Sequence, residues 1–389
     1  MKKYLSLIVL LYTNTIFSQA PGGVTGFAAW LKAGDERSYS LEARQGVSNF
    51  TDAPTGLMNY NGALQLDGRR DNLFFPILAG KLSQATVIVV YMDDEPGKKR
   101  LVWQLRGKFG AIQLSTQNVV NDFDSLSFDF EQSQSPVINT YIKSWKTRGA
   151  ESDNEQGLVL APVENGDMVF KGKLAEYILY DRVLKLAEQR KIESSLAIKY
   201  GISLKKNYVN SAGKTTWNYE DYKSSSSNIL GIGRDDAAAL YQKQSMSGDP
   251  KLPMTISSGS LALNNYRNQA TISDQDFIVI GDDNGKLELN EIAEGLLHRR
   301  WLTQVSGNTA YLLSTELSIN VKGILIPQGN PKGKYFLAID RNADGNFSNG
   351  STEYIEGTIS KDNIVTFKNI HWDKDRSGAD RFTLAYRVV

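Results

Sequence analysis

One stretch, from Gly172 to Leu204, constrains the fold more than any other. Its first part, residues 174–180, is apolar at almost every position, so both faces of the resulting strand should be covered by other elements. The chain upstream shows only strand and turn patterns, and a second strand-rich series begins downstream. The stretch therefore predicts the end of one all-β domain and the passage to the next.

After this strand the sequence predicts a helix over about residues 186–200. Apolar side chains recur every four positions through Ile192 and Leu196 and form one apolar stripe. Gly201 then stands where a left-handed C-terminal cap is needed. We expect the helix to dock through Ile192 and Leu196 and to belong to the first domain. Lys185 occupies the position where a Ser or Thr cap is usual, which predicts a frayed helix start.

The N-terminal residues 1–20 have the pattern of a secretory signal peptide. Two lysines precede the apolar run Leu5–Leu11, and a small-x-small cleavage motif ends at Ala20. The alternative, a membrane anchor, needs a longer apolar run than this one. The sequence has no cysteine for a lipid anchor, and no other stretch of it approaches a membrane span. We therefore expect export through the inner membrane to the cell surface or the medium, with no membrane span after cleavage.

The composition limits what the exported chain can be. Residues 21–389 are enough for two or three domains. The formal net charge of +1 gives no reason to expect a nucleic-acid partner. Because cysteine is absent, stability must come from large cores or bound metal and not from disulfides. The excess of Gly (33) over Pro (10) favours the many tight turns of an all-β protein.

Short strand patterns recur in both halves of the chain. The upstream set comprises Phe27–Leu31, Ala63–Gly68, Ala85–Tyr91, Leu101–Leu105, Ile112–Leu114, Leu126–Phe130, Tyr141–Trp145 and Gly157–Pro162. The downstream set comprises Phe277–Ile280, Tyr311–Leu313, Leu317–Val321, Tyr335–Ile339, Ile364–Phe367 and Phe382–Tyr386. This spacing is typical of β-sandwiches. The sequence predicts one domain over residues 21–204, a polar linker over 205–228 held by Trp217 and Tyr219, and a second domain over 229–389.

Specific motifs agree with this division. GKLAEYILYDRVL and EQRKIESSLAIKYGI, with the opening PGGV, resemble the last strand, exit helix and first strand of laminin-G-like (concanavalin-like) jelly rolls. These jelly rolls occur in large secreted surface proteins of Bacteroidota. NILGIGRDDAAALYQKQS, DFIVIGDDNG and KYFLAIDRNADGNF resemble a companion domain of unknown function that often follows them. The resemblance implies a jelly-roll sandwich with an exit helix and then a second β-sandwich. Many such relatives end in a sorting domain, whereas this chain ends at FTLAYRVV, so we expect either a longer chain or another export route.

The loop from Asp340 to Asn346 is the strongest local signal for chemistry. Side-chain oxygens of Asp340, Asn342 and Asp344 alternate, a glycine follows for a sharp turn, and the Asn346 carbonyl comes next. This is the spacing with which a short loop wraps Ca²⁺. The twelfth position is Ser351 instead of the Glu of an EF-hand, and strands flank the loop. The alternative is a polar hairpin turn, because Asp, Asn and Gly are also turn residues.

No catalytic constellation stands out. Paired carboxylates in one tight motif would indicate a glycosidase, but Asp122, Asp124, Asp129 and Glu131 lie on a pattern that favours a solvated strand face. Only two histidines are present, His298 and His371, and without cysteine no Cys-His chemistry is possible. His298 belongs to a cluster, HRRW, that favours a strand edge with one structural arginine. His371 precedes a tryptophan and predicts packing.

Two further patterns favour structural roles. Gly231 and Gly233 lack the third glycine of a dinucleotide loop, so Arg234, Asp235 and Asp236 predict a local ion pair and turn. Exposed aromatic rings stack on sugars. The candidates are Tyr60, Trp103, Tyr141 and Trp145, although each taken alone is better explained as a core residue.

We therefore expect a secreted or cell-surface, non-catalytic binding or adhesion protein whose partner is a glycan or a surface protein. Ca²⁺ is the one cofactor that the sequence indicates. Two alternatives remain open: a polysaccharide hydrolase on the concanavalin-like fold, and a structural component of an exported assembly.

Overall fold

The computed structural model describes most of the chain. The described residues are 19–33, 41–43, 55–68, 73–75, 84–107, 110–121, 126–129, 133–144, 157–162, 169–290, 295–325 and 333–388. The predicted signal peptide lies outside them except for its last two residues. Within these ranges, no helix combines the length and apolar content needed to cross a membrane.

The first half of the chain forms two antiparallel sheets. The sheet that we call inner has the order β11 (Val137–Ser144), β6 (Gln84–Asp93), β13 (Lys171–Tyr180), β1 (Ala29–Lys32) and β2 (Leu41–Ala43), with the hairpin β3 (Thr55–Met58) and β4 (Asn61–Asp67) joined to β13. The outer sheet has the order β10 (Leu126–Asp129), β9 (Asn118–Asn121), β8 (Gly110–Ser115), β7 (Leu101–Gly107), β12 (Gly157–Leu160) and β5 (Leu73–Phe75).

The second half repeats this architecture. Its inner sheet has the order β17 (Leu240–Gln242), β16 (Ser227–Asp235), β20 (Phe277–Asp282), β21 (Trp301–Ser306), β27 (Ala379–Val388), β23 (Gly333–Asp340) and β24 (Thr352–Glu356). Its outer sheet has the order β18 (Gln244–Met246), β19 (Met254–Ser258), β22 (Thr315–Asn320), β26 (Ile364–Ile370) and β25 (Thr358–Ile359). The expected all-β fold with two sandwiches is confirmed.

Each sandwich has a core between its two sheets. In the first, alternate residues of β6 and β13 meet Trp103 and other residues of the outer sheet. In the second, the core gathers around Trp301, Trp372 and Phe382. The Trp301 and Phe382 rings stack with their centroids 5.4 Å apart. The two cores share no residue, so each sandwich buries its own apolar side chains.

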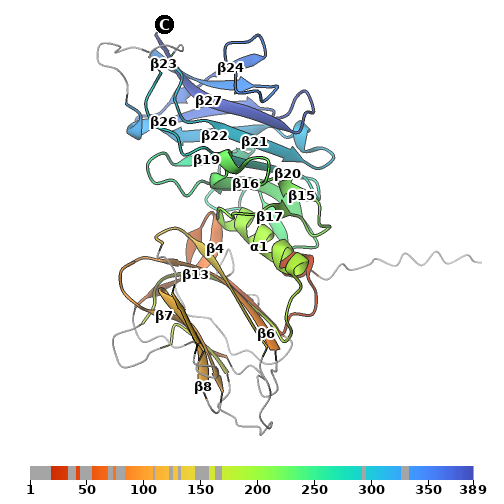
Figure 1. Cartoon of the computed structure of the whole chain (residues 1–389). Coiled ribbons are helices and arrows are strands. Elements are labelled where there is room, and N and C mark those ends of the chain that lie inside the picture. Colours follow the sequence, from red (N-terminus) through yellow and green to blue (C-terminus); the bar gives the residue numbers. More distant parts are fainter. Residues whose placement is uncertain are drawn as a thin grey trace, which may run out of the picture.

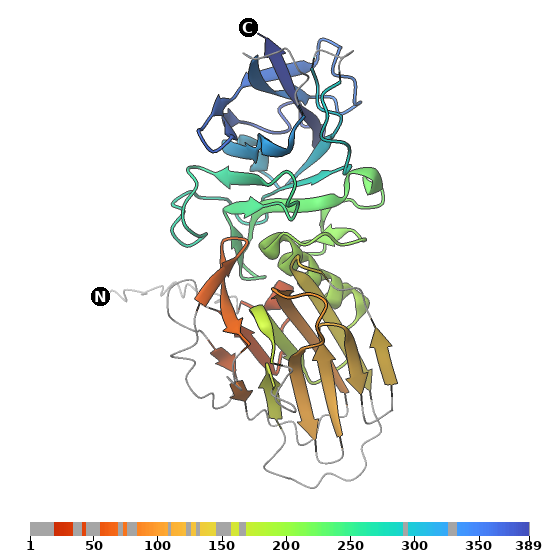
Figure 2. The same cartoon turned by 90° about the vertical axis from the view of Figure 1, so that its left-hand side faces the viewer.

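A third core lies between the sandwiches, around the helix α1 (Leu186–Tyr200). One side of the helix meets the inner sheet of the first sandwich at Ile88 and Ile178, and the other meets the inner sheet of the second at Phe277 and Val279. Figures 1 and 2 show α1 in this position, between the two sandwiches. Ile192 and Leu196 are buried, as expected, but so are residues on other faces of the helix. The helix therefore contacts both sandwiches and not the first alone.

Strand β13 explains how the first sandwich supports this arrangement. Every residue from Leu174 to Tyr180 is buried, which confirms the prediction that both faces are covered. Leu174 and Tyr177 face the core of the first sandwich, while Ala175 and Ile178 face the helix. A bulge between Leu174 and Glu176 shifts the register against β6. The strand is thus the shared wall of two apolar cores.

Both ends of α1 are held by side chains. At the start, Glu188 accepts the Lys185 backbone N–H at 2.8 Å and pairs with both terminal nitrogens of Arg182, also at 2.8 Å. Glu188 therefore supplies the cap that Lys185 lacks, which removes the reason for expecting a frayed helix start. At the other end Gly201 adopts the expected left-handed conformation, with φ 66°.

The buried carboxylate of Glu176 anchors the C-terminal end of α1. It accepts hydrogen bonds from the Trp30 indole at 2.7 Å, Lys199 at 2.6 Å and the Tyr200 hydroxyl at 2.8 Å. Burial alone would raise the pKa of Glu176, but these three donors outweigh it and lower the pKa. The end of the helix is thereby fixed to the inner sheet of the first sandwich.

A polar network, which we call the junction network, fastens the β3–β4 hairpin to the second sandwich. The Asn59 side chain donates to the Ser245 hydroxyl at 3.0 Å and accepts from the Met246 N–H at 2.7 Å. The Asn61 amide donates to Gln242 Oε1 at 3.0 Å and to the Lys199 carbonyl at 2.7 Å. The two sandwiches are therefore joined by specific hydrogen bonds as well as by the helix.

Two local predictions need correction. Residues 205–228 were expected to be a linker, but they contain strands β14 (Tyr208–Val209) and β15 (Thr215–Trp217), and Trp217 is fully buried. The segment packs into the third core. Residues Tyr311–Leu313 were expected to form a strand, but Ala310–Leu312 is a 3-10 helix. An apolar run this short does not distinguish a strand from a helical turn.

Candidate functional site

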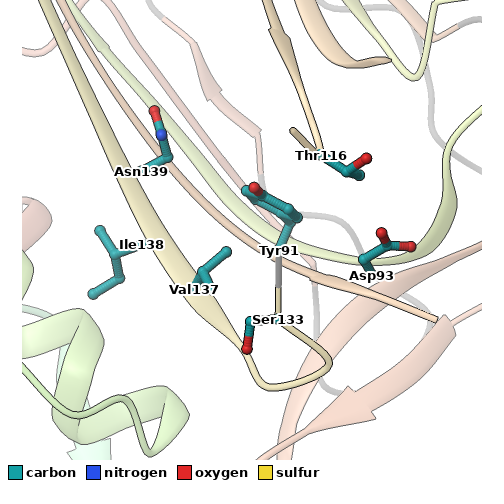
Figure 3. A pocket seen from close by; sticks show the side chains of 7 residues that line it. All are labelled: Tyr91, Asp93, Thr116, Ser133, Val137, Ile138 and Asn139. Carbon is teal, nitrogen blue, oxygen red and sulfur yellow. The ribbon is translucent and has the colours of Figure 1, made fainter. Parts of the chain in front are cut away.

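A pocket of about 200 Å³ opens at the edge of the first sandwich. It lies where the last strand of the inner sheet, β11, meets the C-terminal end of β6 and the loop after β8 in the outer sheet. Its lining consists of Tyr91, Asp93, Thr116, Ser133, Val137, Ile138 and Asn139. Figure 3 shows Asp93 and Thr116 on one side of the Tyr91 ring, with Asn139 on β11 beyond the other. Hydroxyl, amide and carboxylate groups therefore share this pocket with apolar side chains.

Asp93 is the unusual member of this lining. Its side chain is 3% exposed. One oxygen accepts the Glu95 backbone N–H at 2.9 Å, but the other, Oδ2, is buried and has no hydrogen-bond partner among the described residues. Burial raises the pKa of Asp93 above its ordinary value. Most buried polar atoms in proteins have a partner, so this carboxylate is an acceptor left unused by the fold.

The polar groups near Asp93 already have other hydrogen-bond or ion-pair partners. The Thr116 hydroxyl donates to the Lys98 carbonyl at 2.8 Å and accepts from the Arg100 N–H at 3.2 Å. Arg100 itself pairs with Glu95, as does Lys171. Burial and the charge of Asp93 raise the pKa of Tyr91, so its hydroxyl stays protonated. Among the described residues that line the pocket, none carries a positive charge.

The predicted calcium loop connects β23 to β24. The loop closes on itself: Asp340 accepts the Gly345 N–H at 2.7 Å, and Asp344 accepts the Asn346 N–H at 2.7 Å and the Asn342 amide at 3.0 Å. Burial raises the pKa of Asp340. Ser351, at the twelfth position, donates toward Asp340 at 3.3 Å and Asn342 at 3.1 Å. The structure therefore brings the oxygens of Asp340, Asn342 and Ser351 together.

Metal binding at this loop stays a prediction. Within the described residues, no group of three or more His, Asp or Glu side chains is gathered so that it could hold a metal ion. The loop offers two carboxylates, and its remaining oxygens are amide, hydroxyl and carbonyl groups. Because its hydrogen bonds satisfy a polar turn equally well, only a binding measurement distinguishes the two interpretations.

The other candidate residues are dispersed. Asp129 is exposed on β10, whereas Asp122, Asp124 and Glu131 lie outside the described residues. Trp103 is fully buried in the first core, and Tyr141 packs against its ring and accepts a hydrogen bond from Asn121. The Tyr60 hydroxyl lies 3.4 Å from that of Thr255, and Trp145 lies outside the described residues. None of the candidate aromatic rings among the described residues lines the pocket.

The basic cluster HRRW is structural. Arg299 is 4% exposed and pairs with the buried Asp249, while Trp301 belongs to the second core. Arg300 lies over the Phe347 ring, 5.0 Å from its centroid. His298 is exposed. Near the other histidine, the His371 carbonyl accepts from Arg341 at 2.9 Å and Trp372 is fully buried. The expectation of packing roles is thus supported for the tryptophans and Arg299.

The ion pair expected after β16 is present. Arg234 pairs with Asp236 through two hydrogen bonds of 2.7 and 2.8 Å, and Asp235 accepts two from Ser211, both 2.7 Å. These contacts close the turn that leads to β17, as predicted.

Sequence reasoning missed the pocket, although a signal for it exists. Val87, Val89 and Tyr91 alternate along β6 and face the core of the first sandwich. Asp93 continues this alternation, so its side chain points to the same face. The sequence signal is therefore an acidic residue that follows a β-branched run and continues its alternation on the buried face of the strand.

Comparison with known proteins gives little about activity. The profile of a family described as a domain of unknown function, DUF8202, matches residues 188–376. This match begins inside α1 and ends in the second sandwich, where the companion domain of unknown function was expected. No curated protein matches the chain. The laminin-G-like identity of residues 21–204 and the Bacteroidota origin stay predictions.

Several solved structures share a distant likeness. The chain aligns with the binding domain of botulinum neurotoxin serotype D at 11% identity and a TM-score of 0.36, over 93% of this chain and 96% of that one. It aligns with the NanB sialidase from Streptococcus pneumoniae at 12% identity and a TM-score of 0.26, over 78% of this chain and 56% of that one. These TM-scores are too low to carry the role of either protein over to this chain.

Proposed function

We propose that the protein is an exported, non-catalytic binding or adhesion protein of the cell surface, whose ligand site is the pocket around Asp93. One observation supports this most strongly: Asp93, a buried carboxylate with one oxygen that has no donor among the described residues, lines a pocket. An unsatisfied buried acceptor costs about 1–3 kcal/mol, and a ligand that donates a hydrogen bond recovers part of that cost. We assign the partner to the glycan class, with surface glycoproteins included.

The composition of the lining favours binding over hydrolysis. Glycosidases typically use two carboxyl groups, about 5–5.5 Å apart when they retain configuration and about 6.5–9.5 Å apart when they invert it. Among the described residues that line the pocket, Asp93 is the only acid, and none is a histidine. The remaining groups are hydroxyls, an amide and apolar side chains, which orient a ligand without transferring protons. The pocket therefore fits recognition better than bond cleavage.

A glycan array tests this proposal directly. The mature chain, residues 21–389, is screened beside the variant Ser133→Trp, which places a large ring at the pocket rim. We expect selective binding to a small set of glycans and its loss in the variant. Bound glycans are then incubated with the protein and analysed for cleavage. A blank array contradicts glycan recognition, and release of free sugar contradicts the non-catalytic assignment.

A further inference from the structure

We infer that the pocket takes one uncharged sugar ring, whose hydroxyl groups donate hydrogen bonds to Asp93, and that it rejects acidic sugars. This inference rests on the proposed function and names the class of glycan. It follows from three properties of the lining: the polarity of its hydrogen-bonding groups, its charge and its size.

The hydrogen-bonding pattern requires a donor on the ligand. An ionised carboxylate only accepts hydrogen bonds, and Asp93 Oδ2 receives none from the described residues. The nearest hydroxyl in the lining, Thr116, already donates to the Lys98 carbonyl. A sugar hydroxyl supplies the missing donor once the Asp93 side chain turns this oxygen, which has almost no accessible surface, toward the pocket. Asn139 and Ser133 add an amide and a second hydroxyl that can donate to or accept from the rest of the ring.

The charge of the site excludes an anionic group. Asp93 contributes a negative charge to the lining, and none of the described lining residues contributes a positive one. The nearby cations pair with Glu95, which contacts Lys98, Arg100 and Lys171. These pairs hold the pKa of Glu95 down to about 2, with the Lys171 contact as the largest cause. Burial raises the pKa of Asp93 and Arg100 partly offsets this rise, but the Arg100 guanidinium is already paired with Glu95. A sugar carboxylate in the pocket would therefore meet Asp93 with no cation of its own among the described lining residues.

The size of the pocket limits the ligand to one ring. Its volume is about 200 Å³. Sites for drug-sized ligands are larger, roughly 300–1,000 Å³. Tyr91 and Val137 supply apolar surface, which suits the C–H face of a pyranose. A terminal monosaccharide of a longer glycan fits these dimensions, and the rest of the chain would remain outside.

The test is a calorimetric titration of the mature chain with a panel of monosaccharides. The neutral set contains the methyl glycosides of glucose, galactose, mannose and N-acetylglucosamine, and the acidic set contains glucuronate and N-acetylneuraminate. We expect one or more neutral sugars to bind and both acidic sugars to fail. Asp93→Asn should weaken neutral binding about tenfold or more, because it removes a charged acceptor. Asp94→Asn is the matched control, since Asp94 lies outside the lining and accepts from Gln65 at 2.9 Å.

Ser133→Trp provides a second variant that leaves Asp93 intact, so the inference does not depend on how well Asp93→Asn folds. Equal binding of acidic sugars, or unchanged affinity in both Asp93→Asn and Ser133→Trp, would overturn the inference. If the array finds a glycan whose binding neither variant changes, glycan recognition survives, but the inference and the assignment of the pocket as the ligand site both fail. If neither the array nor the titration detects a sugar, the proposed function and the inference both fail.

Discussion

The junction network and the pocket both bury polar side chains, but they differ in whether the buried polar atoms have hydrogen-bond partners. At the junction, Asn59 and Asn61 meet donors and acceptors from the second sandwich and from α1. In the pocket, Asp93 Oδ2 meets none among the described residues. A satisfied polar network fixes one arrangement of a protein, whereas an unsatisfied acceptor costs stability unless something else binds it. Under the proposed function, this difference separates the part of the molecule that holds the two sandwiches together from the part that recognises a ligand.

The largest effect should come from the apolar part of the junction. Leu196→Ala removes a side chain that is 4% exposed in the core shared by both sandwiches, and should cost about 2–5 kcal/mol of unfolding free energy. Leu186→Ala is the control, because Leu186 lies on the same helix but is 66% exposed. Urea unfolding measures both. A loss of less than about 0.5 kcal/mol for Leu196→Ala, as at a surface site, would contradict a buried helix.

The second prediction concerns the loop Asp340–Asn346, where the turn interpretation and the Ca²⁺ interpretation differ. If it binds Ca²⁺, a free-ion concentration a hundredfold above the dissociation constant stabilises the native protein by about 2.7 kcal/mol. Chelation should then lower the melting temperature of the second sandwich, and Asp344→Ala should abolish that response. Asp362→Ala, in an exposed turn, should keep it. Calorimetry with and without chelator measures the shift, and a flat result for the unmodified protein would leave only the polar turn.

The third prediction tests the polar part of the junction. Asn61→Ala leaves the buried Gln242 Oε1 without this donor and removes one of two donors to the Lys199 carbonyl, which keeps the Asn59 amide at 3.0 Å. We expect a loss of about 1–3 kcal/mol. Gln65→Ala on the same strand should change stability by less than about 0.5 kcal/mol, because its amide reaches the exposed Asp94 side chain. Equal effects of the two substitutions would mean that the junction hydrogen bonds do not hold the sandwiches together.

The smallest effect on the free energy of unfolding is expected for a substitution in the pocket, and this substitution should stabilise the protein. Burial raises the pKa of Asp93 above 3.8, so the folded protein binds the proton more tightly than the unfolded chain. The stability that this proton provides is fully present at pH values below the pKa of Asp93 in the unfolded chain. It is lost as the pH rises through the pKa of Asp93 in the folded protein. Asp93→Asn should therefore gain about 1 kcal/mol relative to the unmodified protein at neutral pH, and less in acid.

Urea unfolding of both proteins at about pH 4.5 and about pH 7.5 measures this difference. Burial also raises the pKa values of Asp282 and Asp380, each to about 6, and these groups reduce stability over the same pH range. They are present in both proteins, so their contribution cancels in the comparison. If Asp93→Asn is less stable at neutral pH, the carboxylate has a partner that stabilises its charge.

Much of the local structure follows from the sequence because it depends on near neighbours. The helix bounds, the Gly201 cap and the covered faces of β13 all follow from apolar spacing within a single element. The junction could not be predicted in this way. Asn59 and Asn61 are ordinary turn residues until the hairpin meets Gln242 and Ser245, which lie more than 180 positions later.

The same limit applies to the helix and to the pocket. A single stripe through Ile192 and Leu196 predicts one buried side, and only the second sandwich explains why other sides are also buried. Asp93 ends a strand that is apolar from Val87 to Met92, and its missing partner becomes visible only when the outer sheet and β11 close around it. Contacts between elements that are distant in sequence therefore decide which polar residues are structural and which remain available.

The division between a structural junction and a recognising pocket can be tested by hydrogen-exchange mass spectrometry with the tightest-binding neutral sugar. If the pocket around Asp93 binds the sugar, we expect slower exchange in peptides that cover the end of β6 and residues 133–140, and unchanged exchange around Asn59 and in the loop Asp340–Asn346. The slowing should disappear in Asp93→Asn. Ligand protection confined to the second sandwich, or protection that persists in Asp93→Asn, would contradict recognition by this pocket.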